Sequence, residues 1–157
     1  MNPILVFDIY KKYCIFTQKT NSFFEMTFTY PKSERLKSKN TIDLLFSNGK
    51  SVSKYPLRLV FVPTQNQDNQ PIIMGVSVSK RYFKKAVDRN YFKRILRETY
   101  RKNKSILTAN CSKQYSMMLF YQTKDRYTYS EIEIKTQQIF EKFIQNLNEH
   151  TDIAHTI

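Results

Sequence analysis

Alternating apolar and polar positions predict two strands in the middle of the chain. In the segment 55–63, YPLRLVFVP, the residues Leu57, Leu59 and Phe61 fall on one side, and the residues between them fall on the other. The segment 72–80, IIMGVSVSK, repeats the pattern. A period of two is typical of half-buried strands. The polar loop TQNQDNQP joins the two segments, which suggests that they pair antiparallel.

A helix is predicted just before these strands, in SERLKSKNTIDLLFSNGK. Its apolar residues recur at intervals of three and four, as on one face of a helix. Ser33 could cap its start, and so could Asn40 or Thr41 if the helix is shorter. Gly49 is placed to end it.

Two further helices and a third strand complete the predicted order. One helix runs from about residue 88 to 103, with Asp88 as its N-cap. An apolar strand follows at about 115–121. The last helix begins near Ser130, whose spacing from Glu133 is that of a capping box. Helix, strand, strand, helix, strand and helix together predict an α/β (α+β) two-layer sandwich with helices on a small sheet.

The predicted helix at 88–103 has two chemically distinct sides. Phe92, Ile95 and Leu96 fall together on the side that would pack on the sheet. The opposite side carries Arg89, Asn90, Lys93, Arg94, Arg97 and Arg101. Like charges at helical spacing destabilise a helix by a few tenths of a kcal/mol per pair. We therefore expect this side to face a polyanion, whose phosphates suit the planar guanidinium group.

Charge is concentrated in the same region. The chain carries 26 Lys and Arg against 13 Asp and Glu, a net charge of +13. Eleven of these cations lie between Lys80 and Lys104, against only two acids. Such a patch is typical of nucleic-acid binding, whereas a charge that serves solubility alone would be spread evenly. A solvated surface helix and a membrane-surface helix are the alternatives, and the second is disfavoured because the apolar side is needed to cover a sheet.

Several other classes of protein are excluded or disfavoured. With two glycines in all, the chain cannot form a glycine-rich phosphate loop. Cys14 and Cys111 form neither a disulfide framework nor a metal motif, so we expect a reducing, cytoplasmic location. The sequence shows no signal peptide and no membrane-spanning run. No nucleophile–base pair or paired carboxylates stand out, so no catalytic residue is predicted.

The length of 157 residues suits one domain, predicted at 26–150. Residues 1–25 differ from the rest, and Met26 offers an alternative start. The first 25 residues are therefore either an upstream extension or a short element that packs on the domain. The final residues, 151–157, are expected to fray.

The motif RNYFKRILRE resembles the Arg-Asn-x-x-Lys-Arg-x-x-Arg-Glu signature of the protein subunit of bacterial ribonuclease P. The resemblance extends upstream through KAVDRN, GVSVSKR and FSNGKSV, and covers about residues 36–104. The residues that match the signature are Arg89, Asn90, Lys93, Arg94, Arg97 and Glu98. Two positions depart from the family: Phe83 stands where many members have glycine, and Ile42 where they often have an aromatic residue.

The resemblance implies a fold and a division of labour. The sheet is expected to be mostly antiparallel with a left-handed βαβ crossover, as in a ribosomal-protein domain. A separate RNA subunit, using Mg²⁺ that it holds itself, removes the 5′ leader of precursor tRNA. The protein assists as a non-catalytic subunit, with no membrane contact and no obligate protein partner.

The resemblance also implies two sets of RNA-binding residues. One set binds the RNA subunit and extends the positive field toward the substrate: Arg89, Asn90, Lys93, Arg94, Arg97, Arg101, Lys80, Arg81, Lys84 and Lys85. The other lines a cleft for the single-stranded leader: Phe46, Ile42, Arg58, Ser77 and Ser79. Phe46 could equally be an ordinary core residue.

Three rival functions remain at this point. A ribosomal or other structural RNA-binding protein would share the basic helix but would not stimulate tRNA cleavage. A DNA-binding regulator should have a helix-turn-helix partner, which the sequence does not show. A stand-alone nuclease should show a catalytic constellation.

Overall fold

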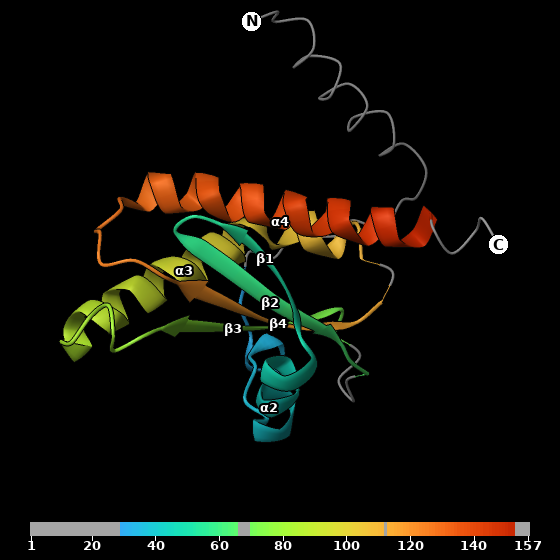
Figure 1. Cartoon of the computed structure of the whole chain (residues 1–157), viewed down its shortest axis with the longest axis horizontal. Coiled ribbons are helices and arrows are strands. Elements are labelled where there is room, and N and C mark those ends of the chain that lie inside the picture. The colour runs from blue at the N-terminus through green and yellow to red at the C-terminus, as the bar shows by residue number, and fades with distance from the viewer. Residues whose placement is uncertain (1–28, 66–69, 112, 153–157) are drawn as a thin grey trace, which may run out of the picture.

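A computed structural model describes residues 29–65, 70–111 and 113–152. Its elements are the 3₁₀ turn η1 (Lys32–Glu34), α2 (Lys39–Asn48), β1 (Lys50–Lys54), β2 (Leu57–Pro63), β3 (Ile72–Val78), α3 (Ala86–Thr108), β4 (Tyr115–Tyr121) and α4 (Tyr129–Asp152). The four strands form one sheet in the order β1-β2-β4-β3. Figure 1 shows α3 and α4 on one face of this sheet and α2 on the other.

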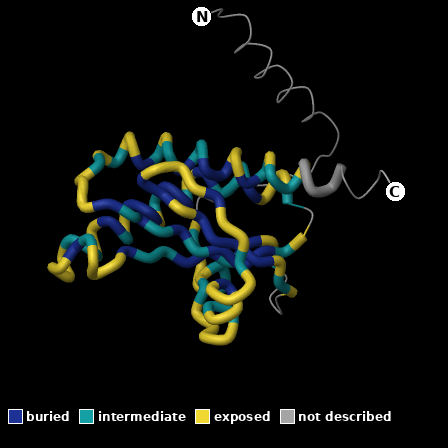
Figure 2. Tube along the Cα trace, viewed as in Figure 1, coloured by how far each residue is buried: buried dark blue, intermediate teal, exposed yellow. Residues whose placement is uncertain are grey.

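The main core lies between the sheet and the pair α3 and α4. Alternate strand residues such as Leu59, Met74 and Leu119 point into it and meet Phe92 and Phe140 from the two helices. A smaller cluster on the opposite face joins Leu45 of α2 to Val60 and Val62 of β2. The burial pattern in Figure 2 follows this division, with α2 mostly exposed. The predicted α+β sandwich is therefore confirmed.

The predicted antiparallel pairing of the strands at 57–63 and 72–78 is wrong. β4 lies between β2 and β3, antiparallel to β2 and parallel to β3. Parallel neighbours need a long crossover, and α3 supplies it. The strand β1 was not predicted, because in KSVSK only Val52 is buried. An edge strand with one buried residue gives little hydrophobic signal.

The helix starts also differ from the predictions. α2 begins at Lys39, where the Ser38 side chain accepts from the amide of Thr41. None of the three predicted caps, Ser33, Asn40 and Thr41, is therefore the N-cap. α3 begins at Ala86 with Lys85 as N-cap.

The carboxylate of Asp88 therefore lies inside the first turn of α3, where it accepts from Arg126 at 2.9 Å. At the start of α4, Thr128 and Glu131 form the reciprocal capping bonds that Ser130 and Glu133 were predicted to make. Helix boundaries are thus set by contacts that sequence spacing alone does not reveal.

Polar residues fix how α3 sits on α4. The hydroxyl of Thr136 lies 3.2 Å from that of Thr99, and the Gln137 amide donates to Asn103 at 3.0 Å. These groups are largely buried, so leaving them unpaired would be unfavourable. They favour one register of the two helices.

The two ends of the chain are described only in part. The proposed extension at 1–25 and the alternative start at Met26 lie outside the described residues. α4 extends to Asp152, into the tail that was predicted to fray, and residues 153–157 also lie outside the description. Among the helices of the described part, none has the length and apolar character to cross a membrane.

Candidate nucleic-acid interface

The two predicted sides of α3 are present in the structure. Phe92, Ile95 and Leu96 are buried against the sheet and α4. The side chains of Asn90, Arg94 and Arg97 are exposed on the other side, and those of Arg89, Lys93 and Arg101 are partly exposed. The apolar side provides the packing that holds the helix, so the cationic side is free to meet a ligand.

Glu98 organises one of the arginines on this side. Nε of Arg101 lies 2.9 Å from Oε2 of Glu98, and Nη2 lies 2.5 Å from Oε1. Donation from Arg101 lowers the pKa of the Glu98 carboxyl. A bidentate pair of this kind fixes the plane of the guanidinium group. Among the described ion pairs, Glu98 contacts Arg101 and not Arg94.

A hollow of about 490 Å³ opens beside this pair. Arginines from two elements line it, since Arg35 from the N-terminal segment faces Arg94, Arg97 and Arg101 of α3. Arg35 lies over the Tyr30 ring at 5.2 Å and donates to the Tyr30 carbonyl. Sequence reasoning missed Arg35, because the chain reversal that brings residues 30–36 beside α3 leaves no local pattern. Four guanidinium groups, together with the Glu98 carboxylate, thus line one open hollow, and planar guanidinium groups are suited to phosphate oxygens.

Arg89 has a different position from the exposed arginines. Its Nη1 donates to the carbonyl oxygens of Phe83 and Lys84, at 3.0 and 2.5 Å. Arg89 therefore ties the loop 79–85 to the start of α3. Lys80, Arg81, Lys84 and Lys85 are all exposed on that loop, next to the cationic side of the helix.

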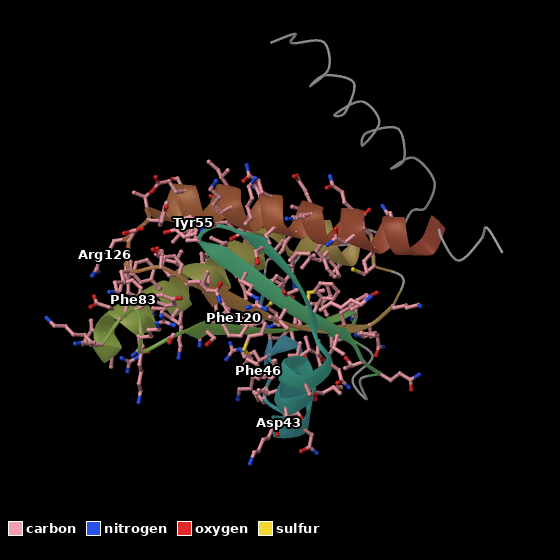
Figure 3. All side chains as sticks on the ribbon, viewed as in Figure 1. Asp43, Phe46, Tyr55, Phe83, Phe120 and Arg126 are labelled. Atoms are coloured by element: carbon pink, nitrogen blue, oxygen red, sulfur yellow. The ribbon has the colours of Figure 1, made fainter. Side chains whose placement is uncertain are left out.

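A groove on the other face of the sheet has the features expected for binding a single strand. Leu45, Phe46, Arg58 and Phe120 are among the residues that line its volume of about 200 Å³. The Phe46 side chain is 65% exposed, and its ring meets that of Phe120 edge-on at 6.0 Å (Figure 3). Aromatic faces beside a cation are typical of sites that bind unpaired bases.

Strand register determines which residues reach this groove. Ser53, Arg58, Phe120 and Ser77 lie in one row across the sheet. Arg58 lines the groove, whereas Ser77 lies on the same face of the sheet without being among the residues that line the groove. Phe120 was not predicted, because an apolar strand such as 115–121 does not reveal which face stays open.

Ser79 and Ile42, which were predicted to line the cleft, are not among the residues that line this groove. Ser79 follows β3, where its Oγ accepts from the Arg81 amide at 3.1 Å and its carbonyl accepts from the amides of Tyr82 and Phe83. Ser79 therefore shapes the basic loop. Ile42 is partly buried on α2, one turn before Phe46.

Comparison with known proteins identifies the family. A sequence model of the ribonuclease P family matches residues 30–144. The chain belongs to the ribonuclease P protein family. A ribonuclease P protein component from Porphyromonas gingivalis is 43% identical over 81 residues, which cover 52% of this chain and 59% of that protein. The one from Chlorobaculum tepidum is 34% identical over 85 residues, covering 52% of this chain and 55% of that protein.

Solved structures share the fold. The ribonuclease P protein from Thermotoga maritima has a TM-score of 0.56 at 22% identity, covering 69% of this chain and 96% of that one. The Staphylococcus aureus protein has a TM-score of 0.56 at 21% identity, covering 69% and 93%. At this identity the likeness supports the architecture alone. The alignments with the two sequence relatives span less than two thirds of those proteins.

The position of Phe83 explains how this ribonuclease P family member accommodates its departure from glycine. The ring is buried, stacks on Phe92 at 4.6 Å and lies 6.0 Å from Tyr121. The bulky residue thus anchors the basic loop to the core rather than projecting toward a ligand. The Ile42 position lacks a ring, but Phe120 supplies a second aromatic group to the same groove.

Proposed function

We propose that the chain is the protein subunit of ribonuclease P. In this function it binds the catalytic RNA subunit and the 5′ leader of precursor tRNA, and it assists endonucleolytic removal of the leader. The observation that carries the proposal is the display of the family signature on the open side of α3, with the apolar side buried. The enzyme is then a ribonucleoprotein whose protein component performs no bond cleavage.

The two surfaces suit different parts of that task. The exposed arginines of α3 and the hollow beside them fit the phosphates of a folded RNA, which a guanidinium fork can contact in bidentate fashion. The groove with Phe46, Phe120 and Arg58 fits an unpaired leader, since stacking is tolerant of base identity. They lie on opposite faces of the sheet, so both can be occupied at once (Figure 1).

We predict that the complex requires Mg²⁺, and we predict no Mg²⁺ site on this chain. In the described residues, no group of three or more His, Cys, Asp and Glu side chains could hold a metal ion. We propose that Mg²⁺ is held mainly by the RNA. A cytoplasmic location and the lack of an obligate protein partner also remain proposals.

Reconstitution tests the function directly. Purified protein is added to in-vitro transcribed ribonuclease P RNA and precursor tRNA at low magnesium, and leader removal is followed over time. We expect faster cleavage with the wild-type protein, a much smaller gain with Arg94→Ala, and a wild-type gain with Lys113→Ala. Lys113 is an exposed cation in the loop before β4, and it lines a different hollow from the one that Arg94 lines.

A structural RNA-binding protein is the alternative that this experiment separates. Such a protein would bind the RNA in a salt-sensitive manner and leave the cleavage rate unchanged. That result would refute the proposed function and leave the basic face as a general RNA-binding surface.

A further inference from the structure

Exposed cations also gather at one end of the sheet, in addition to those on the cationic side of α3 and on the basic loop 79–85. The register places the last residues of β1, β3 and β4 in one row with the first residue of β2. The β1–β2 turn, the β3–α3 loop and the β4–α4 loop therefore leave the sheet together. Lys54, Lys124 and Arg126 are exposed there, beside the basic loop 79–85. Figure 3 shows Tyr55, Phe83 and Arg126 at this end of the molecule.

Tyr55 combines exposure with a fixed position. Its side chain, at the tip of the β1–β2 turn, is 60% exposed. Its hydroxyl is nevertheless in hydrogen-bond contact with Oγ1 of Thr123 at 2.9 Å and Oδ2 of Asp125 at 3.0 Å. The Tyr127 ring meets it edge-on at 6.2 Å. An exposed ring whose far end is held in this way loses little entropy when a ligand stacks on it.

The three acids described at this end all have partners, and Glu131 accepts from the amide and hydroxyl of Thr128. The Asp125 carboxylate accepts from the hydroxyls of Tyr55 and Thr123. The Asp88 carboxylate is paired with Arg126, whose guanidinium also lies 5.7 Å from the centre of the Phe92 ring. The pairing offsets the repulsion that Asp88 would exert on a phosphate, and the Arg126 side chain remains 59% exposed.

We propose that Tyr55, Lys54, Lys124 and Arg126 form a binding site for an unpaired nucleotide of RNA. The Tyr55 ring stacks on the base, and the three cations contact the neighbouring phosphates. This site, the Tyr55 platform, is separate from the α3 face and from the Phe46 groove. The proposal rests on the proposed RNA-binding function and adds a contact that the family signature does not contain.

The chemistry favours a single strand over a duplex. Bases within a helix are stacked on each other and offer no free face to a protein ring, whereas an unpaired base does. Exposed cations alone would accept either form, because they contact only phosphates. The ring of Tyr55 is therefore the group that selects the single strand.

A tryptophan reporter tests the platform where it lies. The chain has no tryptophan, so Tyr55→Trp introduces a single fluorophore. Ile134→Trp is the matched control, since Ile134 on α4 is 52% exposed. Both proteins are titrated with a single-stranded oligoadenylate and with an RNA duplex of equal length. We expect the single strand to quench the Tyr55→Trp protein in a salt-sensitive manner, with little quenching by the duplex or of the Ile134→Trp protein.

Affinity measurements provide a second test that does not depend on a tryptophan. We expect Tyr55→Ala to weaken binding of the oligoadenylate by roughly 5- to 150-fold, since stacking on one base is lost. Its salt dependence should stay at the wild-type slope, because no phosphate contact is removed. Tyr55→Phe, which keeps the ring and loses the hydroxyl contacts, should fall between. Each variant is also made together with Phe46→Ala, so that binding of the oligoadenylate in the Phe46 groove does not add to the measured affinity.

The outcomes separate this proposal from the proposed function. If Tyr55→Ala binds as tightly as the wild type while Arg94→Ala binds more weakly, the platform is refuted and RNA binding by α3 stands. Equal quenching of the Tyr55→Trp protein by duplex and single strand would also refute it. If the wild-type protein binds neither the oligoadenylate nor ribonuclease P RNA, both proposals fail. Should Tyr55→Ala not fold, Tyr55→Phe and the reporter decide.

Discussion

The arginines on the cationic side of α3 differ in their surroundings. Arg89 donates to two loop carbonyls, and Arg101 is held by Glu98. Arg94 is exposed and, among the described residues, makes no hydrogen bond or ion pair within the protein. Substitutions at these three positions should therefore report different things: loop placement at Arg89, guanidinium orientation at Arg101, and phosphate contact at Arg94.

Arg94→Ala should weaken binding of ribonuclease P RNA and flatten its salt dependence. One lost phosphate contact reduces the slope of log affinity against log salt by about 0.7 to 0.9. The measurement is filter binding across a series of salt concentrations, with Lys113→Ala as the control. An unchanged slope for Arg94→Ala would exclude a phosphate role for this residue.

The Glu98 carboxyl should titrate below an ordinary glutamate. Its pKa is lowered because Arg101 donates to the ionised form. The sign follows from linkage: a depressed pKa in the folded protein means that the pair contributes above the unfolded pKa and is lost as the pH falls through the folded one. NMR titration of the Glu98 side chain measures this. In Arg101→Ala the midpoint should rise toward that of a free glutamate, and a midpoint that does not move would show that Arg101 is not the cause.

At the scale of elements, α2 depends on how closely it approaches β2. Gly49 ends the helix, and a Cβ placed there would lie 2.2 Å from the Leu45 carbonyl oxygen and 2.7 Å from Cγ1 of Val60. The Gly49 backbone has φ −69°, so the requirement is for space and not for an unusual conformation. This contact sets the position of Phe46 over the sheet and so the shape of the groove.

Gly49→Ala should therefore destabilise the protein. Overpacking of a closed site costs about 1–3 kcal/mol, and here backbone atoms must move. Urea unfolding measures the loss. Gly75→Ala is the comparison, since its added Cβ would meet only side chains of Leu36 and Met118, at 3.2–3.3 Å. Equal losses for the two variants would contradict this account of α2.

The start of α4 offers a second test at this scale. Thr128 caps the helix through its hydroxyl and accepts the amide of Glu131 at 3.4 Å. We expect Thr128→Ala to lower the free energy of unfolding by about 1 kcal/mol, the usual loss for such a cap. Ser130→Ala, the cap that sequence spacing suggested, should have little effect. A larger loss at Ser130 than at Thr128 would overturn the observed boundary.

For the whole molecule, sequence periodicity predicted which side of each helix and strand is buried, but it did not predict the order of the strands in the sheet. The sides of α3 and the faces of β2 and β3 follow from local spacing, because side-chain direction repeats with the backbone. The position of β4 between β2 and β3 does not follow from local spacing, because the pairing of strands depends on contacts between residues that are far apart in the sequence. For the same reason Arg35, Phe120 and the Asp88–Arg126 pair could not be read from neighbouring residues. The motif was enough to locate the cationic side of α3, whereas the tertiary fold adds Arg35 to it.

Opposite placement of the α3 face and the groove leads to a prediction for the assembled enzyme. Phe46→Ala should reduce affinity for precursor tRNA in the reconstituted complex and leave affinity for leaderless tRNA nearly unchanged. Loss of stacking on one base is worth about 1–3 kcal/mol. Leu44→Ala, on the exposed side of the same helix, is the control. Equal weakening with both substrates would show that Phe46 does not contact the leader.

The central position of β4 has a consequence for synthesis on the ribosome. While only the chain as far as Cys111 has emerged, β2 and β3 cannot join into one sheet, because the strand that lies between them is still to come. Their unpaired edges are then open to unwanted association. The arginine-rich helix has already been made at that stage but has no finished support. A nascent chain therefore gains a competent RNA-binding shape only late in its translation.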